Sequence, residues 1–165
     1  MKVAVIMGSD SDLPVLQPAL DTLEQFHINY EVLVASAHRT PETVHEFAAG
    51  AAGRGVQVII AAAGAAAHLP GVIASYTTLP VIGIPVDSTS VGGLDALLSI
   101  VQMPAGIPVA TMAINGAKNA ALFAVQILAT GNGEMADGLV RYRQTMAVEV
   151  EQKNARLQEK LNQKR

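Results

Sequence analysis

The chain has 165 residues, the length of one domain that buries a sizeable core. Its formal net charge is −3, with 11 Lys and Arg against 14 Asp and Glu, so it lacks the basic face that sequence-independent binding to DNA or RNA requires. Apolar residues make up 50% of the sequence and charged residues 15%, where about 25% charged is usual for a soluble domain. This composition excludes a disordered chain and predicts that other copies of the chain cover part of the surface.

The sequence contains no cysteine, which excludes disulfide bonds and thiolate metal sites and is typical of a reducing compartment. Its longest apolar run, residues 58–67, is shorter than the roughly 20 residues that a membrane-spanning helix needs. We therefore expect a soluble cytoplasmic protein that binds neither nucleic acid nor membranes.

Five short apolar runs rich in β-branched residues alternate with stretches of helical period. The runs predict strands buried on both faces, over residues 2–7, 29–35, 56–62, 81–85 and 107–113. Helices are predicted after Asp12 and Thr40, whose side chains are expected to cap them, after Pro70, and over about residues 93–102 and 119–130. The alternation predicts an α/β fold, a flavodoxin-like doubly wound three-layer sandwich with a five-stranded parallel sheet.

The end of the chain differs in composition from the rest. Of the 25 charged residues, 12 lie at positions 134–165, which predicts a long charged helix, and Gly138 favours a break in it. We expect a single domain over residues 1–165 in which residues 134–165 form a C-terminal helical extension. That helix either packs on its own domain or contacts a neighbouring subunit. Its apolar residues are too sparse to decide between the two.

In sheets of this type, ligands bind beyond the carboxyl ends of the strands, because the loops there share one edge and the following helices point their N-termini at it. We call this the carboxyl edge. Its loops are expected at residues 8–12, 36–40, 63–68, 87–93 and 115–119. Almost every polar candidate in the sequence falls in one of them.

The first two of these loops suit a phosphorylated ligand. Residues 8–12, Gly-Ser-Asp-Ser-Asp, offer hydroxyls and backbone N–H groups at a helix start, with simple helix capping as the alternative explanation. The second loop contains Arg39, one of only four basic side chains before position 134, beside Ser36 and His38. In a region with so few charges, a phosphate clamp is favoured over a surface ion pair.

Two of the four histidines, His38 and His68, fall at the carboxyl edge, whereas His27 and His45 fall in helical stretches and are expected to be structural. An imidazole gives and takes protons near neutral pH, so two of them at one edge predict proton-transfer chemistry. A metal site is the rival interpretation, but the pair lacks an obvious third ligand. The acidic residues of the first loop are better explained as a cap and an acceptor for a ligand hydroxyl.

Several motifs with known chemistry are absent from the sequence. It has no P-loop, no G-x-G-x-x-G after a strand and no G-x-S-x-G nucleophile elbow. A phosphoacceptor receiver domain would share the fold, but the third strand ends in Ala-Gly where that class needs its aspartate. A flavin site needs aromatic side chains around the ring, and the sequence has three Tyr and no Trp.

Four motifs occur in order along the chain. They are Met-Gly-Ser-Asp-Ser-Asp at 7–12, Ser-Ala-His-Arg-Thr-Pro at 36–41, Ala-Ala-His-Leu-Pro-Gly at 66–71 and Ser-Ile-Val-Gln-Met-Pro at 99–104. Together they closely resemble the class I PurE family, the N5-carboxyaminoimidazole ribonucleotide mutases of purine biosynthesis, over residues 2 to about 130. The resemblance implies a flavodoxin-like subunit, a homo-octamer with sites at subunit junctions, and no metal or organic cofactor.

The family's reaction moves a carboxyl group from the exocyclic nitrogen of the aminoimidazole to ring carbon C4. His38 matches the catalytic acid–base of that reaction. His68 matches a histidine in the loop that closes over the imidazole, where the resemblance implies a supporting role. The CO2 released on the way needs a pocket of small apolar side chains and N–H groups, and residues 63–67 have that composition.

The resemblance also implies which residues bind the ribonucleotide. Ser9 and Asp12 match positions that hold it, with Asp12 facing the ribose hydroxyls. Ser36 and Arg39 match positions near its phosphate and carboxylate. The remaining expected binding residues are Gly8, Ser11, Ala37, Gly64, Ala67, His68 and Leu69.

Two departures from the family pattern stand out. Ala62 and Ala65 occupy positions where many members have glycine, and a methyl group there narrows the CO2 pocket or stiffens its loop. Residues 113–120 look shorter than the usual pattern, which affects any contact expected from the fifth loop. Two other functions stay open: a carboxylase that adds CO2 directly to aminoimidazole ribonucleotide, and a non-catalytic flavodoxin-like binding module.

Overall fold

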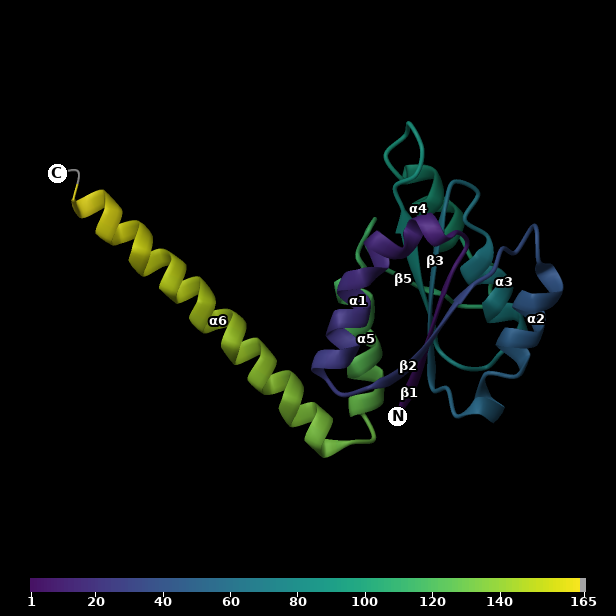
Figure 1. The fold of residues 1–165 in the computed structure, drawn as a ribbon, viewed down its shortest axis with the longest axis horizontal. Helices are drawn as coiled ribbons and strands as arrows, with labels where there is room; N and C mark the ends of the chain where they lie inside the picture. The colour runs from purple at the N-terminus through teal and green to yellow at the C-terminus, as the bar shows by residue number, and fades with distance from the viewer. Residues whose placement is uncertain (164–165) are drawn as a thin grey trace. The chain divides into compact units, whose positions relative to one another are not determined.

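Five parallel strands form one sheet in the order β2-β1-β3-β4-β5 (Figure 1). The structure is a computed structural model that describes residues 1–163. It contains two compact units, Met1–Leu128, which holds the sheet, and a second that begins at Ala129. The strand order is that of flavodoxin-like doubly wound proteins, so the predicted fold class is confirmed.

The central strands are buried as predicted, because their Val, Ile and Ala side chains lie between helices on both faces. These strands are β1 (Lys2–Met7), β3 (Val58–Gly64) and β4 (Val81–Val86). The prediction of burial on both faces is wrong for β2 (Asn29–Val34), which is an edge strand with a partner on one side only.

The fifth strand is much shorter than the predicted run 107–113. Only β5 (Ala110–Thr111) pairs with β4. Pro108 has no N–H to donate to a ladder, which explains why pairing does not begin earlier. The third strand also begins two residues later than predicted, at Val58.

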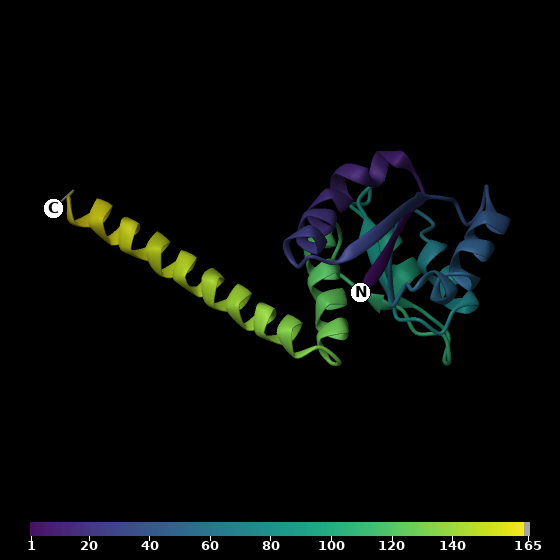
Figure 2. The same ribbon diagram turned by 60° about the horizontal axis from the view of Figure 1, so that its bottom comes forward.

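Helices cover both faces of the sheet, as Figures 1 and 2 show. On one face lie α1 (Leu13–Gln25) and α5 (Ala117–Ala129), side by side. On the other lie α2 (Pro41–Ala49), α3 (Leu69–Tyr76) and α4 (Leu94–Val101), which share a core with the strands. Two short 3-10 turns complete the unit, η1 (Asp10–Asp12) and η2 (Ala52–Arg54).

The two expected helix caps are wrong. The side chains of Asp12 and Thr40 make no capping hydrogen bond to α1 or α2. The chain instead enters α1 through η1, whose cap is Ser9. The Thr40 hydroxyl accepts from the N–H of Ser36 at 2.9 Å and donates to its carbonyl at 3.2 Å, so it closes the second loop.

The second unit contains α6 (Gly133–Asn162), which begins at an Asn132 side chain that accepts from the Met135 N–H at 2.9 Å. The predicted long charged helix is confirmed, and its final residues 164–165 lie outside the described part of the chain. The predicted break at Gly138 is wrong, because one glycine costs a helix only about 1 kcal/mol and strong helix formers surround it. No helix within residues 1–163 is long and apolar enough to cross a membrane.

Candidate active site

The ends of β2, β1 and β3 lie next to one another at the carboxyl edge, and the predicted site residues lie between these strand ends and the first residue of the helix that follows each loop. Hydrogen bonds extend the sheet into these loops. The Gly8 N–H donates to the Ala62 carbonyl at 3.3 Å, and the Ala35 N–H donates to the Met7 carbonyl at 2.9 Å. The three loops therefore start from fixed, adjacent points.

In the first loop, the Ser9 hydroxyl organises the backbone. It accepts from the Ser11 N–H at 3.3 Å and from the Ser11 hydroxyl at 2.8 Å, and it donates to Asp10 at 3.3 Å. These bonds hold a tight turn of polar groups at the start of η1. Simple helix capping, the alternative explanation for this loop, is correct for Ser9, which caps η1. It does not explain Asp12, whose side chain caps no helix.

Asp12 is the one buried acidic side chain among residues 1–163, at 7% exposure. Burial raises the pKa of this carboxyl above its ordinary value, a hydrogen bond from the Ser9 backbone partly opposes the rise, and the nearby Asp10 charge adds to it. A buried carboxylate that caps no helix is a costly feature. The Asp12 carboxyl thus lies at the carboxyl edge without serving as a helix cap.

In the second loop, the Ser36 hydroxyl accepts from the backbone N–H groups of His38 and Arg39, both at 3.3 Å. The Thr40 N–H donates to the Ser36 carbonyl at 2.9 Å and closes the turn. The loop therefore presents two consecutive functional side chains, an imidazole and a guanidinium, from a hydrogen-bonded turn.

Arg39 makes no ion pair within residues 1–163, so the surface ion-pair alternative is not what the structure contains. Its guanidinium donates to the Gly8 carbonyl at 3.1 Å and joins the second loop to the first. By contrast, Lys2 and Arg54 both pair with Glu31, at 2.6 and 2.8 Å. Arg39 thus places a positive charge beside the polar turn of the first loop. An anionic group bound there could contact both the guanidinium and the groups of that turn.

The rings of His38 and His68 meet directly. His38 Nε2 and His68 Nδ1 are 2.8 Å apart, a hydrogen-bond distance, and the ring centroids are 4.9 Å apart with planes at 80°. The sequence placed both histidines at one edge, but it gave no indication of contact because 29 residues separate them along the chain. This contact is the most specific feature of the site.

The third loop brings His68 to this position through an unusual backbone. Ala65 has a φ of 53°, in the left-handed region. The Ala67 N–H then donates to the Ala65 carbonyl at 2.9 Å, and the His68 N–H donates to the Ala66 carbonyl at 2.8 Å. These tight turns place His68 at the N-terminus of α3.

Three of the expected binding residues expose little or no side chain. Ala67 and Leu69 are buried, at 1% and 3% exposure. Gly64 has no space for a side chain, because an added Cβ would lie 2.9 Å from the Ser88 Cβ. Ser88 lies in the loop after β4, which the sequence placed at this edge, but it was not among the expected binding residues.

The remaining histidines lie elsewhere, as expected. His45 packs its ring against Tyr76, with centroids 4.5 Å apart, between α2 and α3. His27 follows α1 rather than lying within it, and adopts a φ of 53°. Within residues 1–163, no group of three or more His, Asp and Glu side chains is arranged to hold a metal ion.

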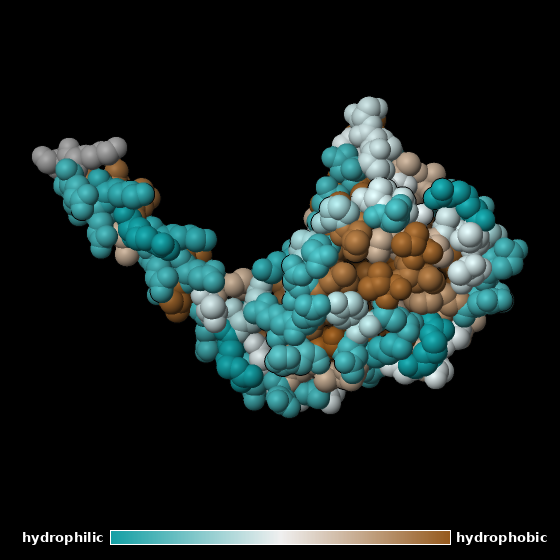
Figure 3. Space-filling model, in the orientation of Figure 1, coloured by the Kyte–Doolittle hydropathy of each residue, from teal (hydrophilic) through white to brown (hydrophobic). Residues whose placement is uncertain are grey.

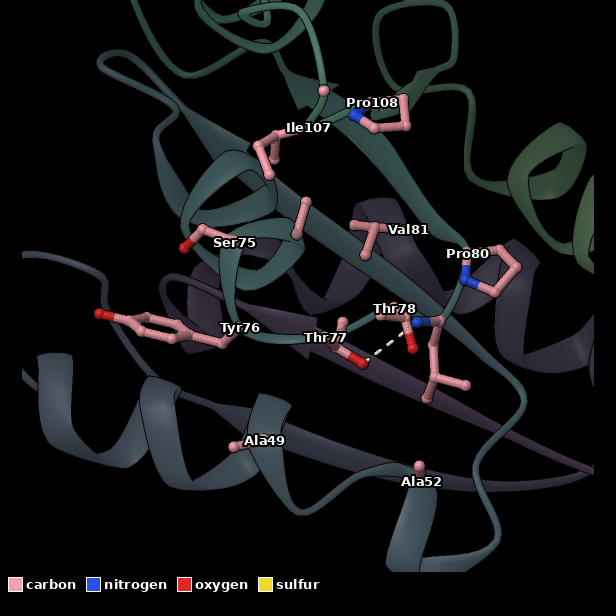
Figure 4. A pocket seen from close by; sticks show the side chains of 13 residues that line it. Ala49, Ala52, Ser75, Tyr76, Thr77, Thr78, Pro80, Val81, Ile107 and Pro108 are labelled. Atoms are coloured by element: carbon pink, nitrogen blue, oxygen red, sulfur yellow. Dashed lines mark hydrogen bonds between the residues drawn. The ribbon is translucent and has the colours of Figure 1, made fainter.

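A hollow of about 740 Å³ lies away from these loops, at the amino ends of β4 and β5 (Figure 4). It is lined mainly by the end of α3 and the segments that enter the two strands, including Tyr76, Pro80 and Ile107. A hydrogen bond from the Leu79 N–H to the Thr77 hydroxyl, 3.2 Å long, braces its wall. Its lining contains none of the predicted site residues and no charged side chain.

Comparisons with known proteins agree on one family. Residues 2–149 match the family described as AIR carboxylase. The chain is 58% identical to the N5-carboxyaminoimidazole ribonucleotide mutase of Pyrococcus horikoshii, over 95% of this chain and 89% of that protein. It is 54% identical to the mutase of the same name from Thermotoga maritima, over 99% and 98% of the two chains.

The fold comparison agrees. The crystal structure of Treponema denticola PurE matches with a TM-score of 0.83 and 29% identity, over 94% of this chain and 98% of that one. The family match and the structural match both extend over most of the chain, so the similarity does not rest on a single motif. The chain belongs to the AIR carboxylase family.

Proposed function

We propose that this chain is an N5-carboxyaminoimidazole ribonucleotide mutase of purine biosynthesis, with His38 as its acid–base catalyst. The observation that carries the assignment is the 54% identity to the Thermotoga maritima mutase over nearly the full length of both chains. The paired imidazoles at the carboxyl edge supply the chemistry that such a reaction needs.

The reaction has two halves that require opposite proton transfers. In the first, the bond between the exocyclic nitrogen and the carboxyl carbon breaks, CO2 leaves and the nitrogen gains a proton. In the second, C4 of the ring attacks CO2 and then loses its own proton. The protonated His38 gives the first proton, and the neutral His38 takes the second, so the enzyme ends with the proton it started with.

The same loops provide groups for the rest of the ribonucleotide. Arg39, with the hydroxyls and N–H groups around Ser9 and Ser36, would bind the anionic groups. The buried Asp12 carboxylate would accept from the ribose hydroxyls. Gly8, Ser11, Ala37, Gly64, Ala67 and Leu69 complete the proposed binding set, and His68 supports His38.

The released CO2 must stay near C4 until it reacts. Ala63 and Ala67 are buried, at 7% and 1% exposure, and the residues between them have small side chains. Such a wall offers CO2 an apolar surface and backbone N–H groups while it leaves no competing nucleophile.

We also propose that the chain acts in the cytoplasm as a homo-oligomer, an octamer as the family resemblance implies, with α6 as its helical extension. Apolar side chains remain exposed on β2, where Val32 and Val34 are 44% and 50% exposed, and on α4, where Leu94 and Leu98 are about half exposed. Figure 3 shows an apolar patch on the face of residues 1–128 turned to the viewer, in the region of β2. Exposed patches of this kind are typical of subunit contacts.

The activity is tested by following the 4-carboxy product by ultraviolet absorbance with the N5-carboxylated substrate. His38→Gln should lower kcat by on the order of 10²–10⁴, the range of general acid–base catalysis, with KM within a few-fold of wild type. His45→Gln is the matched control, because His45 packs against Tyr76 away from these loops. Equal activity of the two variants would contradict the role of His38.

A further inference from the structure

His68 is the one side chain hydrogen-bonded to the His38 ring within residues 1–163, and neither ring pairs with a carboxylate there. In hydrolases with a catalytic triad, a carboxylate holds the second nitrogen of the catalytic imidazole and fixes its tautomer. At this site an imidazole occupies that place. The question is therefore which of the two facing nitrogens carries the shared proton.

We propose that His68 is a positioning residue whose Nδ1 accepts a hydrogen bond from Nε2–H of His38, so that Nδ1 of His38 exchanges the proton with the substrate. The inference rests on the proposed mutase function and goes beyond it. It assigns a tautomer to each histidine and a reacting atom to the catalyst. His68 then carries its own proton on Nε2.

The opposite arrangement fails on chemical grounds. If His68 Nδ1–H were the donor, neutral His38 would carry its proton on Nδ1 and would have both ring nitrogens engaged. With His68 neutral, it could then give a proton only by becoming an imidazolate anion, and it could not take the proton from C4. With Nε2–H donating, neutral His38 has a free lone pair on Nδ1, and its protonated form gives that same proton back.

The proton balance of the cycle follows from this arrangement. The Nδ1–H of the His38 imidazolium passes its proton to the exocyclic nitrogen as the bond from nitrogen to the carboxyl carbon breaks. The neutral His38 ring keeps its Nε2–H, which still donates to Nδ1 of His68. After C4 has bonded to CO2, Nδ1 accepts the C4 proton, and the imidazolium is restored.

Both loops are built to keep the two rings together. The Ser36 turn fixes the backbone of His38 through the 3.3 Å bond to its N–H. The left-handed Ala65 and the two tight hydrogen bonds that follow it fix the backbone of His68. The backbone of each histidine is therefore held by hydrogen bonds within its own loop, and the two rings meet without a ligand.

The tautomers are read directly from 15N chemical shifts of the free enzyme labelled with 15N-histidine, at a pH where both rings are neutral. Signals are assigned by their loss in His38→Gln and in His68→Asn. The expected result is a protonated Nε2 and a bare Nδ1 on both residues. A proton on Nδ1 of either residue would overturn the inference.

Kinetics of two His68 variants provide the second readout. His68→Asn keeps an acceptor oxygen near the position of Nδ1, whereas His68→Leu keeps the bulk and loses the acceptor. His68→Leu should lower kcat about 10-fold or more with KM nearly unchanged, and His68→Asn should recover most of that loss. Equal losses in the two variants would overturn the positioning role.

These outcomes separate the inference from the proposed function. If the wild type converts the carbamate but carries a proton on Nδ1 of either histidine, the tautomer inference alone is wrong. If the wild type does not convert the carbamate but has the expected tautomers, the mutase assignment is wrong and the direction of the hydrogen bond is supported.

Discussion

Ala65 holds its backbone in the left-handed region, with a φ of 53°, where an L-residue with a Cβ is strained by about 1–2 kcal/mol. Ala65→Gly removes that strain and adds the entropy cost of glycine, about 0.5–1 kcal/mol, so a net stabilisation of up to about 1.5 kcal/mol is expected. The midpoint of urea denaturation measures it. Ala66→Gly is the control, because Ala66 is also exposed and has no positive φ, and it should be destabilising. Midpoints that move in the same direction would contradict the account.

Asp12 is predicted to cost stability at neutral pH, since burial raises the pKa of its carboxyl above the ordinary 3.8. Because the pKa of Asp12 is higher in the folded state than in the unfolded state, its protonated carboxyl contributes fully to stability below the unfolded-state pKa. That contribution is lost as the pH rises through the folded-state pKa. Asp12→Asn should therefore melt at a higher temperature than wild type at pH 7, and the difference should shrink as pH falls toward 4. Asp21→Asn, on the exposed side of α1, is the control. A difference in melting temperature that does not change with pH would refute this explanation.

At the scale of elements, Gly83 sets how closely α4 packs on β4. An added Cβ would lie 2.5 Å from Ile100 and 3.0 Å from Val109, both apolar side chains packed against the sheet. Gly83→Ala should cost about 1–3 kcal/mol of unfolding free energy, the usual penalty of overpacking a core. Gly53→Ala, in η2 with nothing within 4 Å of the new Cβ, should be close to neutral. Chemical denaturation measures the unfolding free energy of both variants. An equal change in the two would contradict the close packing at Gly83.

The same elements indicate how far sequence reasoning reached. Hydrophobic period alone located β1 and α1 and the alternation that fixes a parallel sheet, because buried strands and amphipathic helices leave strong local patterns. It was wrong about the burial of β2, which depends on the neighbours of that strand in the sheet, and about the length of β5, where Pro108 has no N–H to donate. It also failed at Thr40, whose hydroxyl serves a turn instead of a helix.

The candidate site was predictable in part for the same reason. Strand ends and loop composition placed His38, Arg39 and His68 at one edge from the sequence. The contact between the two imidazoles and the burial of Asp12 were not predictable, because both depend on how separate loops pack in three dimensions. The approach of Ser88 to Gly64 is a further contact of this kind.

At the scale of the whole molecule, the low charge of residues 1–128 and the exposed apolar side chains of β2 and α4 predict self-association. Sedimentation velocity at micromolar concentration should give one species several times heavier than the 17.2 kDa chain. Leu98→Glu places a charge on the exposed face of α4 and should shift the sample toward smaller species without unfolding it. A wild type that sediments as a monomer would contradict the proposed assembly.

The central claim is that this chain isomerises a carbamate rather than fixing free CO2. The direct measurement compares formation of the 4-carboxy product from N5-carboxyaminoimidazole ribonucleotide with its formation from aminoimidazole ribonucleotide plus bicarbonate. The account predicts fast turnover of the carbamate, negligible turnover of the second mixture and loss of activity in His38→Gln. Preference for the uncarboxylated nucleotide with bicarbonate would contradict it, as would the absence of product from both.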